Sequence, residues 1–299
     1  MIFLTFAAAD GSHLGLLIDD KVLDLTKAWP GAGQVSAPRH VGDLAEAGEA
    51  GLAIVRDLAS SGSAANLVAL ASLTLMAPIP RPKKNVFCVG RNYKDHIDEG
   101  MRAQGKAPAP LPSVPEFFTK PPTAVIASGE TIPQHANVTE QLDYEVELAV
   151  IIGKPGSNIS AQNAFNHVFG YSIINDITGR DMQRRYGQWF KGKGLDRSCP
   201  FGPVVVHASA LPNVSDLRIF STVNGEVRQD SRTSHMIFDI PAIIEHLTRG
   251  LTLEPGDVIA TGTPSGVGYA MTPPRFLLKG DRVTAEIEGI GILSNSIGA

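Results

Sequence analysis

Residues 143–150 alternate carboxylates with apolar side chains. Because side chains alternate between the faces of a strand, Asp143, Glu145 and Glu147 are expected on one face and the apolar residues on the other. The apolar run continues through residues 151–152, which indicates an interior strand rather than a solvated edge. Neighbouring carboxylates about 4 Å apart repel by roughly 4 kcal/mol at an effective dielectric of about 20. Protonation or a bound cation relieves this repulsion, and such oxygen ligands suit a hard divalent metal.

Composition narrows the class of protein. The 299 residues carry a formal charge of −4, with 43% hydrophobic and 19% charged residues, which is typical of a soluble globular protein. No basic run indicates nucleic-acid binding, and no apolar run approaches the roughly 20 residues of a membrane span. Two cysteines, Cys88 and Cys199, argue against a disulfide scaffold, and the apolar surroundings of Cys88 are typical of an inert core thiol. The first nine residues lack the basic start of a signal peptide, so we expect a cytoplasmic protein.

The chain is expected to form a small N-terminal domain, residues 1–76, and a larger domain, residues 83–299. Three prolines within residues 77–84 are incompatible with a helix or a central strand and indicate a linker. In the small domain, the patterns predict three strands and two helices. The strands are at residues 2–6, 14–18 and 22–25, and the helices are at residues 41–59 and 64–70.

In the larger domain, short strands outnumber helices. The predicted strands are at residues 86–90, 124–126, 142–152, 171–175, 202–206, 218–223, 258–261, 282–287 and 290–295. The predicted helices are at residues 94–100, 161–168 and 241–249. This order indicates a mainly β fold with some α, an α+β class with mixed but mostly antiparallel strands. Residues 101–115 are rich in Pro, Ala and Gly and fit either a lid or a plain disordered insertion.

Asp176 is the second acidic landmark. It follows the strand predicted at residues 171–175, at the expected rim of a core. Taken alone, it fits a helix N-cap equally well. Together with Glu145 and Glu147 it completes a set of three carboxylates. Such sets hold Mg²⁺ or Mn²⁺ and leave open positions for water and substrate.

His96 and Glu99 share one face of a predicted helix. Three residues apart, they can hydrogen-bond, and a carboxylate beside imidazole fixes its tautomer and raises its basicity, as a general base needs. Taken alone, the His-x-x-Glu pair is more typical of a solvated helix surface. A zinc site is less well supported, because no second His or Cys lies at ligand spacing. The position directly before residues 101–115 favours the catalytic interpretation.

Two glycine-rich segments carry further candidates. Residues 187–194 lack the spacing of a P-loop, but Lys193 could hold a carboxylate or an oxyanion, unless it lies on a solvated surface turn. Residues 261–268 lack the Gly-x-Ser-x-Gly spacing of a nucleophile elbow, so a serine hydrolase is rejected. We interpret this segment as a rigid loop that presents Thr263 and backbone N–H groups.

Seven short motifs, in this order, resemble the fumarylacetoacetate hydrolase family, especially its acylpyruvate hydrolase-like members. They cover about residues 83–299, and the small N-terminal domain more weakly resembles the one that many bacterial members carry. The motifs are Gly90-Arg91-Asn92-Tyr93 with Asp95-His96 and Glu99, Phe118-x-Lys120-Pro121, Glu145-x-Glu147, Asp176-x-x-x-Arg180-Asp181-x-Gln183, Gly192-Lys193, Ser234-His235-Met236-Ile237-Phe238, and Gly262-Thr263-Pro264-Ser265-Gly266-Val267-Gly268.

The resemblance implies a mixed β-sandwich roll with a small N-terminal α/β domain, a homodimer and a small-molecule 2-oxo acid substrate. It also implies a site for Mg²⁺ or Mn²⁺, which Ca²⁺ can replace in crystals. The implied metal ligands are Glu145, Glu147 and Asp176. The implied catalytic residues are Lys193 and a dyad on a mobile lid helix, His96 and Glu99. The implied substrate-binding residues are Arg91, Tyr93, Arg180, Gln183 and Thr263.

Two positions depart from the family pattern. Many members have Ser after the active-site lysine, where this chain has Gly194. Many bacterial members have Thr four residues after that lysine, where this chain has Arg197. The added cation either favours an acidic substrate tail or faces out of the pocket.

The implied reaction is hydrolysis of a carbon–carbon bond in a 2,4-dioxo acid, of the acylpyruvate or fumarylpyruvate type met in aromatic catabolism, to pyruvate and a carboxylic acid. His96, steadied by Glu99, would deprotonate the attacking water, and Lys193 would stabilise the oxyanion. The same enolate arises in oxaloacetate decarboxylation and in isomerisation of a 2-hydroxyhepta-2,4-diene-1,7-dioate, so both remain alternatives. The presence of both dyad residues favours the hydrolase. A non-catalytic module that binds a structural divalent ion is an alternative of another class.

Overall fold

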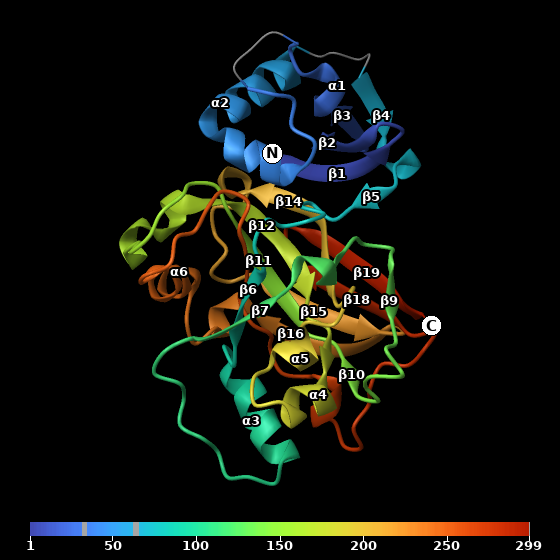
Figure 1. Cartoon of the computed structure of the whole chain (residues 1–299), viewed down its shortest axis with the longest axis vertical. Helices are drawn as coiled ribbons and strands as arrows, with labels where there is room; N and C mark the ends of the chain where they lie inside the picture. The colour runs from blue at the N-terminus through green and yellow to red at the C-terminus, as the bar shows by residue number, and fades with distance from the viewer. Residues whose placement is uncertain (32–34, 62–65, 299) are drawn as a thin grey trace.

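A long, strongly bent sheet forms the body of the protein, and a second sheet packs on one of its faces (Figure 1). The computed structural model describes residues 1–31, 35–61 and 66–298. The long sheet has the order β4-β3-β2-β1-β14-β12-β11-β17-β6-β7, with β5 beside β1 and β8 beside β14. Its strands are β1 (Ile2–Ala8), β2 (Gly11–Ile18), β3 (Lys21–Asp24), β4 (Leu67–Ala69), β5 (Leu75–Met76), β6 (Val86–Gly90), β7 (Glu116–Lys120), β8 (Val125–Ile126), β11 (Val146–Ile152), β12 (Val168–Asn175), β14 (Cys199–His207) and β17 (Val258–Ala260).

The second sheet has the order β16-β15-β18-β19-β9. Its strands are β9 (Thr131–Pro133), β15 (Arg218–Val223), β16 (Glu226–Arg232), β18 (Arg282–Ile287) and β19 (Gly291–Gly298). A separate short pair joins β10 (Leu142–Asp143) to β13 (Thr178–Gly179). Antiparallel pairs predominate, whereas β6–β17, β8–β14 and β9–β19 run parallel. The predicted mixed, mainly antiparallel α+β class is therefore confirmed.

β11 is the central strand on which the site depends, and it is buried along its whole length. Val146 and Leu148 face the second sheet, where they share an apolar core with Ile219 and Ile287. Ala149 points to the opposite face, into a second core that includes residues of the N-terminal strands. Because both faces are covered, the carboxylate of Glu147 on this strand is also held out of water.

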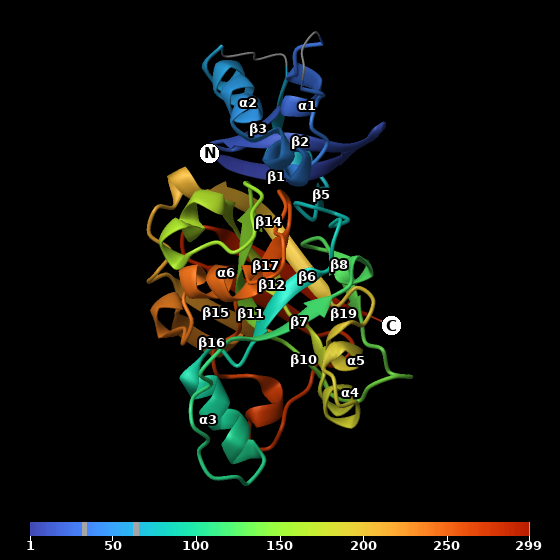
Figure 2. The same ribbon diagram turned by 60° about the vertical axis from the view of Figure 1, so that its left-hand side comes forward.

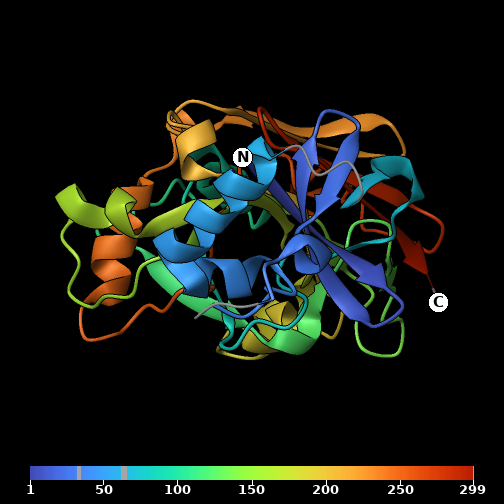
Figure 3. The same ribbon diagram turned by 90° about the horizontal axis from the view of Figure 1, so that it is seen from above.

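The N-terminal residues extend the long sheet. β1 pairs with β14 through Ile2↔Val206 and Phe3↔Val205. Helices α1 (Leu25–Ala28) and α2 (Val41–Ser60) belong to this unit, and Figure 3 looks down on it and shows α2 beside the N-terminal strands. Residues 77–84 contain no helix or strand, as their prolines predict. The division of the chain into domains at residues 76 and 83 remains a prediction, since the sheet continues across it.

The helices of the larger part are short. They are α3 (Lys94–Ala103), α4 (Arg180–Arg185), α5 (Phe190–Lys193) and α6 (Ile240–Thr248). Figures 1 and 2 show α3 at the end of the molecule opposite the N-terminal unit. Within the described residues, no helix is both long enough and apolar enough to cross a membrane.

Two local predictions were wrong because of strand pairing, and a third was right in place but not in helix type. The strand predicted at residues 142–152 breaks at Tyr144 and Glu145, because β10 pairs with β13 and β11 pairs with β12. Of the helix predicted at residues 64–70, residues 64–65 lie outside the described part, and residues 67–69 form β4 because they pair with β3. The helix predicted at residues 161–168 is a 3₁₀ helix, Ala161–His167. The sequence analysis did not identify β5, β7, β9, β13, β16, α1, α4 or α5.

The two-sided burial of β11 predicts the cost of a cavity there. Leu148→Ala should lower the free energy of unfolding by about 2–5 kcal/mol, because it removes packing from the core between the two sheets. Urea unfolding measures this change. Val227→Ala, at a 55% exposed residue, is the matched control and should stay within about 0.5 kcal/mol of wild type. Equal effects of both substitutions would contradict this account of the core.

Candidate metal centre and active site

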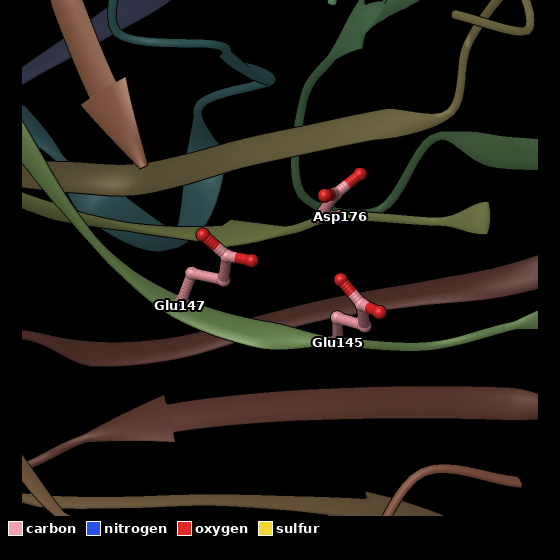
Figure 4. A group of neighbouring side chains, drawn as sticks. All are labelled: Glu145, Glu147 and Asp176. Carbon is pink, nitrogen blue, oxygen red and sulfur yellow. The ribbon is translucent and has the colours of Figure 1, made fainter. Parts of the chain in front are cut away.

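Three buried carboxylates converge beside β11 (Figure 4). Glu145, Glu147 and Asp176 each offer one oxygen, and these atoms lie within 4.8 Å of one another. The pairing of β11 with β12 creates this arrangement, because it sets Val146 opposite Asn175. Asp176 follows Asn175, and its backbone N–H donates to the carbonyl oxygen of Glu145 at 2.8 Å. Two residues remote in sequence are thereby placed side by side.

Three cationic side chains surround the carboxylates, and all three are buried. Lys193 Nζ donates to Glu145 Oε2 at 2.6 Å and to Asp176 Oδ2 at 2.7 Å. Lys120 Nζ donates to Asp176 Oδ1 at 2.8 Å and also contacts the carbonyl oxygen of Lys193. Arg180 Nη1 lies 2.7 Å from Glu145 Oε1. Glu145 and Asp176 are therefore each held between two cations.

These neighbours shift the pKa values in opposite directions. Burial pushes the pKa of Glu145 upward, but the charges of Lys193 and Arg180 outweigh it and hold the pKa well below its usual range. Burial, with repulsion from Asp176 and Glu145, raises the pKa of Glu147 well above its usual range. Burial lowers the pKa of Lys193, but Asp176 and Glu145 reverse this and raise it. Glu147 is thus the carboxylate whose repulsion by the other two is not fully compensated by neighbouring cations.

The donor set fits a hard divalent cation. Glu147 receives one N–H, from Gly262 to Oε2 at 2.7 Å, and no cationic side chain in the described part of the chain forms an ion pair with it. A cation between Glu145, Glu147 and Asp176 would meet three carboxylate oxygens, the ligands that Mg²⁺ and Mn²⁺ prefer. These three residues would hold the ion.

Asp143 has a different function from the other two carboxylates of its segment. The break between β10 and β11 separates it from Glu145 and Glu147. Its carboxylate accepts from the backbone N–H groups of Gly268 at 2.8 Å and Tyr269 at 3.1 Å, and from Arg180 Nε at 2.9 Å. Asp143 therefore positions Arg180 and is not part of the metal set.

His96 and Glu99 form a hydrogen-bonded pair on α3. His96 Nδ1 lies 2.8 Å from Glu99 Oε1, and Glu99 Oε2 accepts from the backbone N–H of Gly266 at 2.8 Å. Because an ionised carboxylate only accepts, we assign the proton of neutral His96 to Nδ1. Nε2 then carries the lone pair. The ring of His96 lines the pocket above the carboxylates.

One pocket of about 380 Å³ unites most of the predicted residues. Those that line it are Arg91, His96, Glu145, Glu147, Arg180, Gln183, Lys193 and Thr263. Asp176 and Glu99 do not line the pocket: Asp176 is fully buried, and Glu99 is hydrogen-bonded to His96. Tyr93 lies outside the lining, is 1% exposed, and its hydroxyl has no hydrogen-bond partner among the described residues. Sequence analysis assigned no role to seven other lining side chains, namely Val89, Gln104, Phe118, Arg184, Tyr186, Trp189 and Tyr269.

Thr263 and Arg91, two of the predicted substrate-binding residues, have partners within the protein. The Thr263 hydroxyl donates to the carbonyl oxygen of Val146 at 2.9 Å and accepts from Gln229 Nε2 at 2.7 Å. Arg91 is at the exposed rim, where it forms a bidentate pair with Glu116. Their roles in substrate binding remain predictions.

The two departures from the family pattern have local explanations. A Cβ at Gly194 would lie 2.8 Å from the carbonyl oxygen of Phe190 and 3.2 Å from Pro121, so the local packing favours glycine. Arg197 donates to the carbonyl oxygen of Thr131 and pairs with Glu130 at 3.0 Å. Its charge is therefore directed to the surface rather than into the pocket.

Comparison with known proteins decides the family. Residues 85–298 match the family described as fumarylacetoacetate (FAA) hydrolase C-terminal. The chain belongs to this family. Oxaloacetate tautomerase YisK of Bacillus subtilis (strain 168) is 46% identical over 307 residues, which cover 100% of both chains.

Solved structures of family members share the fold. Fumarylacetoacetate hydrolase (EaFAH) from psychrophilic Exiguobacterium antarcticum has a TM-score of 0.82 and 39% identity, covering 100% of this chain and 99% of that chain. The 2-hydroxyhepta-2,4-diene-1,7-dioate isomerase from Mycobacterium marinum has a TM-score of 0.74 and 31% identity, covering 100% and 98%. The predicted family and fold class are confirmed. The hydrolase class stays a prediction, because these relatives are named as a tautomerase, a hydrolase and an isomerase.

Removal and return of a metal ion tests the carboxylate set. Mn²⁺ added to EDTA-treated protein should raise the thermal midpoint, since a ligand at a hundredfold excess over its Kd stabilises by about 2.7 kcal/mol. Glu147→Gln should lose most of this gain, whereas Glu140→Gln, at an exposed residue, should keep it. Differential scanning calorimetry measures both. An equal Mn²⁺ response in the two variants would exclude Glu147 as a ligand.

The raised pKa of Glu147 also predicts a pH dependence. A carboxyl whose pKa is raised in the folded state stabilises the fold below its unfolded pKa, near 4.5, and loses that contribution as the pH rises through the folded pKa. In EDTA, wild type should therefore lose stability relative to Glu147→Gln as the pH rises above about 4.5. Urea unfolding across this range gives the comparison. Parallel profiles would contradict the assignment.

Proposed function

We propose that this protein is a metal-dependent enzyme that moves a proton on a short 2-oxo acid, as a keto–enol tautomerase of oxaloacetate or a close analogue. The His96–Glu99 pair carries the proposal, because it places a hydrogen-bonded imidazole in the same pocket as the carboxylate set. The 46% identity to a relative named as an oxaloacetate tautomerase, over the whole of both chains, supports it.

The reaction needs one base that can also return a proton. His96 Nε2 would take a proton from C3 of the keto acid and deliver it to the oxygen on C2, which completes the change from keto to enol without a co-reactant. Glu99 would stabilise the imidazolium formed between the two transfers. A divalent ion held by Glu145, Glu147 and Asp176 would supply Lewis-acid stabilisation of the negative charge on the substrate.

Cationic and polar groups around the pocket would hold the acid. Arg180 and Gln183 both line the pocket, and Arg180 Nη1 donates to Gln183 Oε1 at 3.3 Å. Arg180 Nη2 is buried and has no hydrogen-bond partner within the described residues. An unpartnered guanidinium N–H is well suited to a substrate carboxylate. The free-energy cost of burying this N–H group would be offset when the substrate binds.

The state of Lys193 favours proton transfer over hydrolysis. Hydrolysis needs a placed water and a donor to the oxyanion, in addition to the base. Lys193, the predicted donor, instead directs its ammonium group to Glu145 and Asp176 at 2.6 and 2.7 Å. Tautomerisation requires neither the water nor this donor.

Carbon–carbon hydrolysis of an acylpyruvate is the second candidate. The observation that favours it is the TM-score of 0.82 to a structure named as a fumarylacetoacetate hydrolase. Release of pyruvate from acetylpyruvate, followed with lactate dehydrogenase, would identify it. The same assay on oxaloacetate detects decarboxylation, whereas a tautomerase changes the enol absorbance without releasing pyruvate.

His96→Ala tests the proposal directly. Loss of the general base should slow enol–keto conversion of oxaloacetate by about 10²–10⁴-fold. Mn²⁺ stabilisation should persist, because the three carboxylates are retained. Arg102→Ala, at an exposed residue of the same helix, is the control and should retain full activity. Unchanged turnover in His96→Ala would remove the dyad from the mechanism, and no metal-dependent conversion by wild type would refute the function.

A further inference from the structure

The loop that follows β17 contacts α3 at two points. One is the hydrogen bond from the backbone N–H of Gly266 to Glu99. The other joins Tyr269 to Gly100: a Cβ placed on Gly100 would lie only 2.5 Å from the hydroxyl oxygen of Tyr269, but 3.7 Å from Cζ. The tip of the tyrosine therefore occupies the space that a side chain at position 100 would need. Here α3 packs directly on the hydroxyl oxygen.

The other end of this contact is tied to the carboxylate set. The guanidinium of Arg180 stacks on the ring of Tyr269, with Cζ of Arg180 4.5 Å from the ring centroid. Arg180 in turn contacts Glu145 at 2.7 Å. Asp143 fixes both partners, because it accepts from the backbone N–H of Tyr269 and from Arg180 Nε. The tyrosine ring is held in place by its stacking and by its own backbone.

We propose that Tyr269 is a positioning residue that seats α3, and with it the His96–Glu99 dyad, at a set distance from Arg180 and Glu145. The base and the carboxylate set lie on elements that are far apart in the chain. A base displaced by about 1 Å can lose about a hundredfold in rate, so the reaction needs a rigid spacer between these elements. Tyr269 supplies it by touching α3 with its hydroxyl and Arg180 with its ring.

The contact gives a double-substitution test. Gly100→Ala should displace α3, since its Cβ meets the hydroxyl oxygen at 2.5 Å. Alanine favours a helix more than glycine does, so a loosened helix in this variant cannot come from helix propensity. Tyr269→Phe keeps the ring on Arg180 and removes the oxygen. In the double variant, the nearest atom of residue 269 is then at the ordinary contact distance of 3.7 Å.

Two measurements are needed. Hydrogen–deuterium exchange of peptides covering residues 94–103 should rise in Gly100→Ala and return to the wild-type rate in the Gly100→Ala/Tyr269→Phe variant. Turnover of enol oxaloacetate should fall about 10- to 100-fold in Gly100→Ala with a smaller change in KM, and should recover in the double variant. Tyr269→Phe alone, which removes the oxygen that touches α3, should raise exchange and lower turnover, in each case less than Gly100→Ala does. Gly31→Ala, where a Cβ meets no atom of the described residues within 4 Å, is the matched control.

The hydrogen–deuterium exchange result does not depend on the proposed function. Only the turnover measurement rests on that function. Unchanged exchange in Gly100→Ala, or a double variant as exchangeable as Gly100→Ala, would overturn the seating of α3 by Tyr269. Rescue of exchange together with no turnover by wild type would leave the seating intact and refute the tautomerase. Tyr269→Leu adds a second check: it removes the ring from Arg180 and should lower turnover even though α3 meets no clash.

Discussion

A chain of alternating buried charges holds the site together. From one end it runs through Lys120, Asp176, Lys193, Glu145, Arg180 and Asp143, and every neighbouring pair is in contact at 2.6–2.9 Å. Isolated charges could not be buried in this way, because an unpaired ion in the interior costs many kcal/mol. Removing one partner of a buried pair typically costs about 3–5 kcal/mol, since the other is left uncompensated. The chain therefore fixes the relative positions of all the elements that supply it.

Glu147 is the one carboxylate of the candidate metal set that has no cationic partner within the described residues. It lies against the chain of charges, but its only hydrogen-bond donor within the described residues is the backbone N–H of Gly262. Burial and two neighbouring carboxylates disfavour its charge. A divalent ion held by Glu147, Glu145 and Asp176 would remove that penalty. The site can thus be preorganised by its own cations and still gain from a metal.

A single glycine-rich loop connects the parts. Three of its backbone N–H groups each hold a carboxylate from a different element, namely Gly262 with Glu147, Gly266 with Glu99 and Gly268 with Asp143. Gly262 and Gly266 have φ values of 99° and 108°, which other residues rarely adopt. A Cβ at Gly266 or Gly268 would lie 2.0 Å from a carbonyl oxygen. The sequence analysis predicted that this loop presents N–H groups, and the structure shows that carboxylates of the protein itself receive them.

Most of the residues that converge in the pocket could be selected from the chain alone. Glu145 and Glu147 could be identified because acids are rare in a run of interior strand residues. His96 and Glu99 could be identified because their spacing places them on one face of a helix. Lys120 and Tyr269 were not assigned roles, because nothing local distinguishes a buried lysine or a spacing tyrosine from ordinary ones. Their importance arises from contacts across 56 residues to Asp176 and with α3.

The amino-acid sequence by itself determined the α+β class, the family, the three carboxylates and the dyad, since alternation, spacing and motif order are local properties of the chain. The tertiary structure decided which acid belongs to which set. Strand pairing divides residues 142–152 into β10 and β11. As a result, Asp143 accepts a hydrogen bond from Arg180, whereas Glu145 and Glu147 lie beside Asp176. The tertiary structure also directed Arg197 outward and set Tyr269 between α3 and Arg180. Charge pairing and close packing act between residues distant in sequence, and only the folded chain brings them within range.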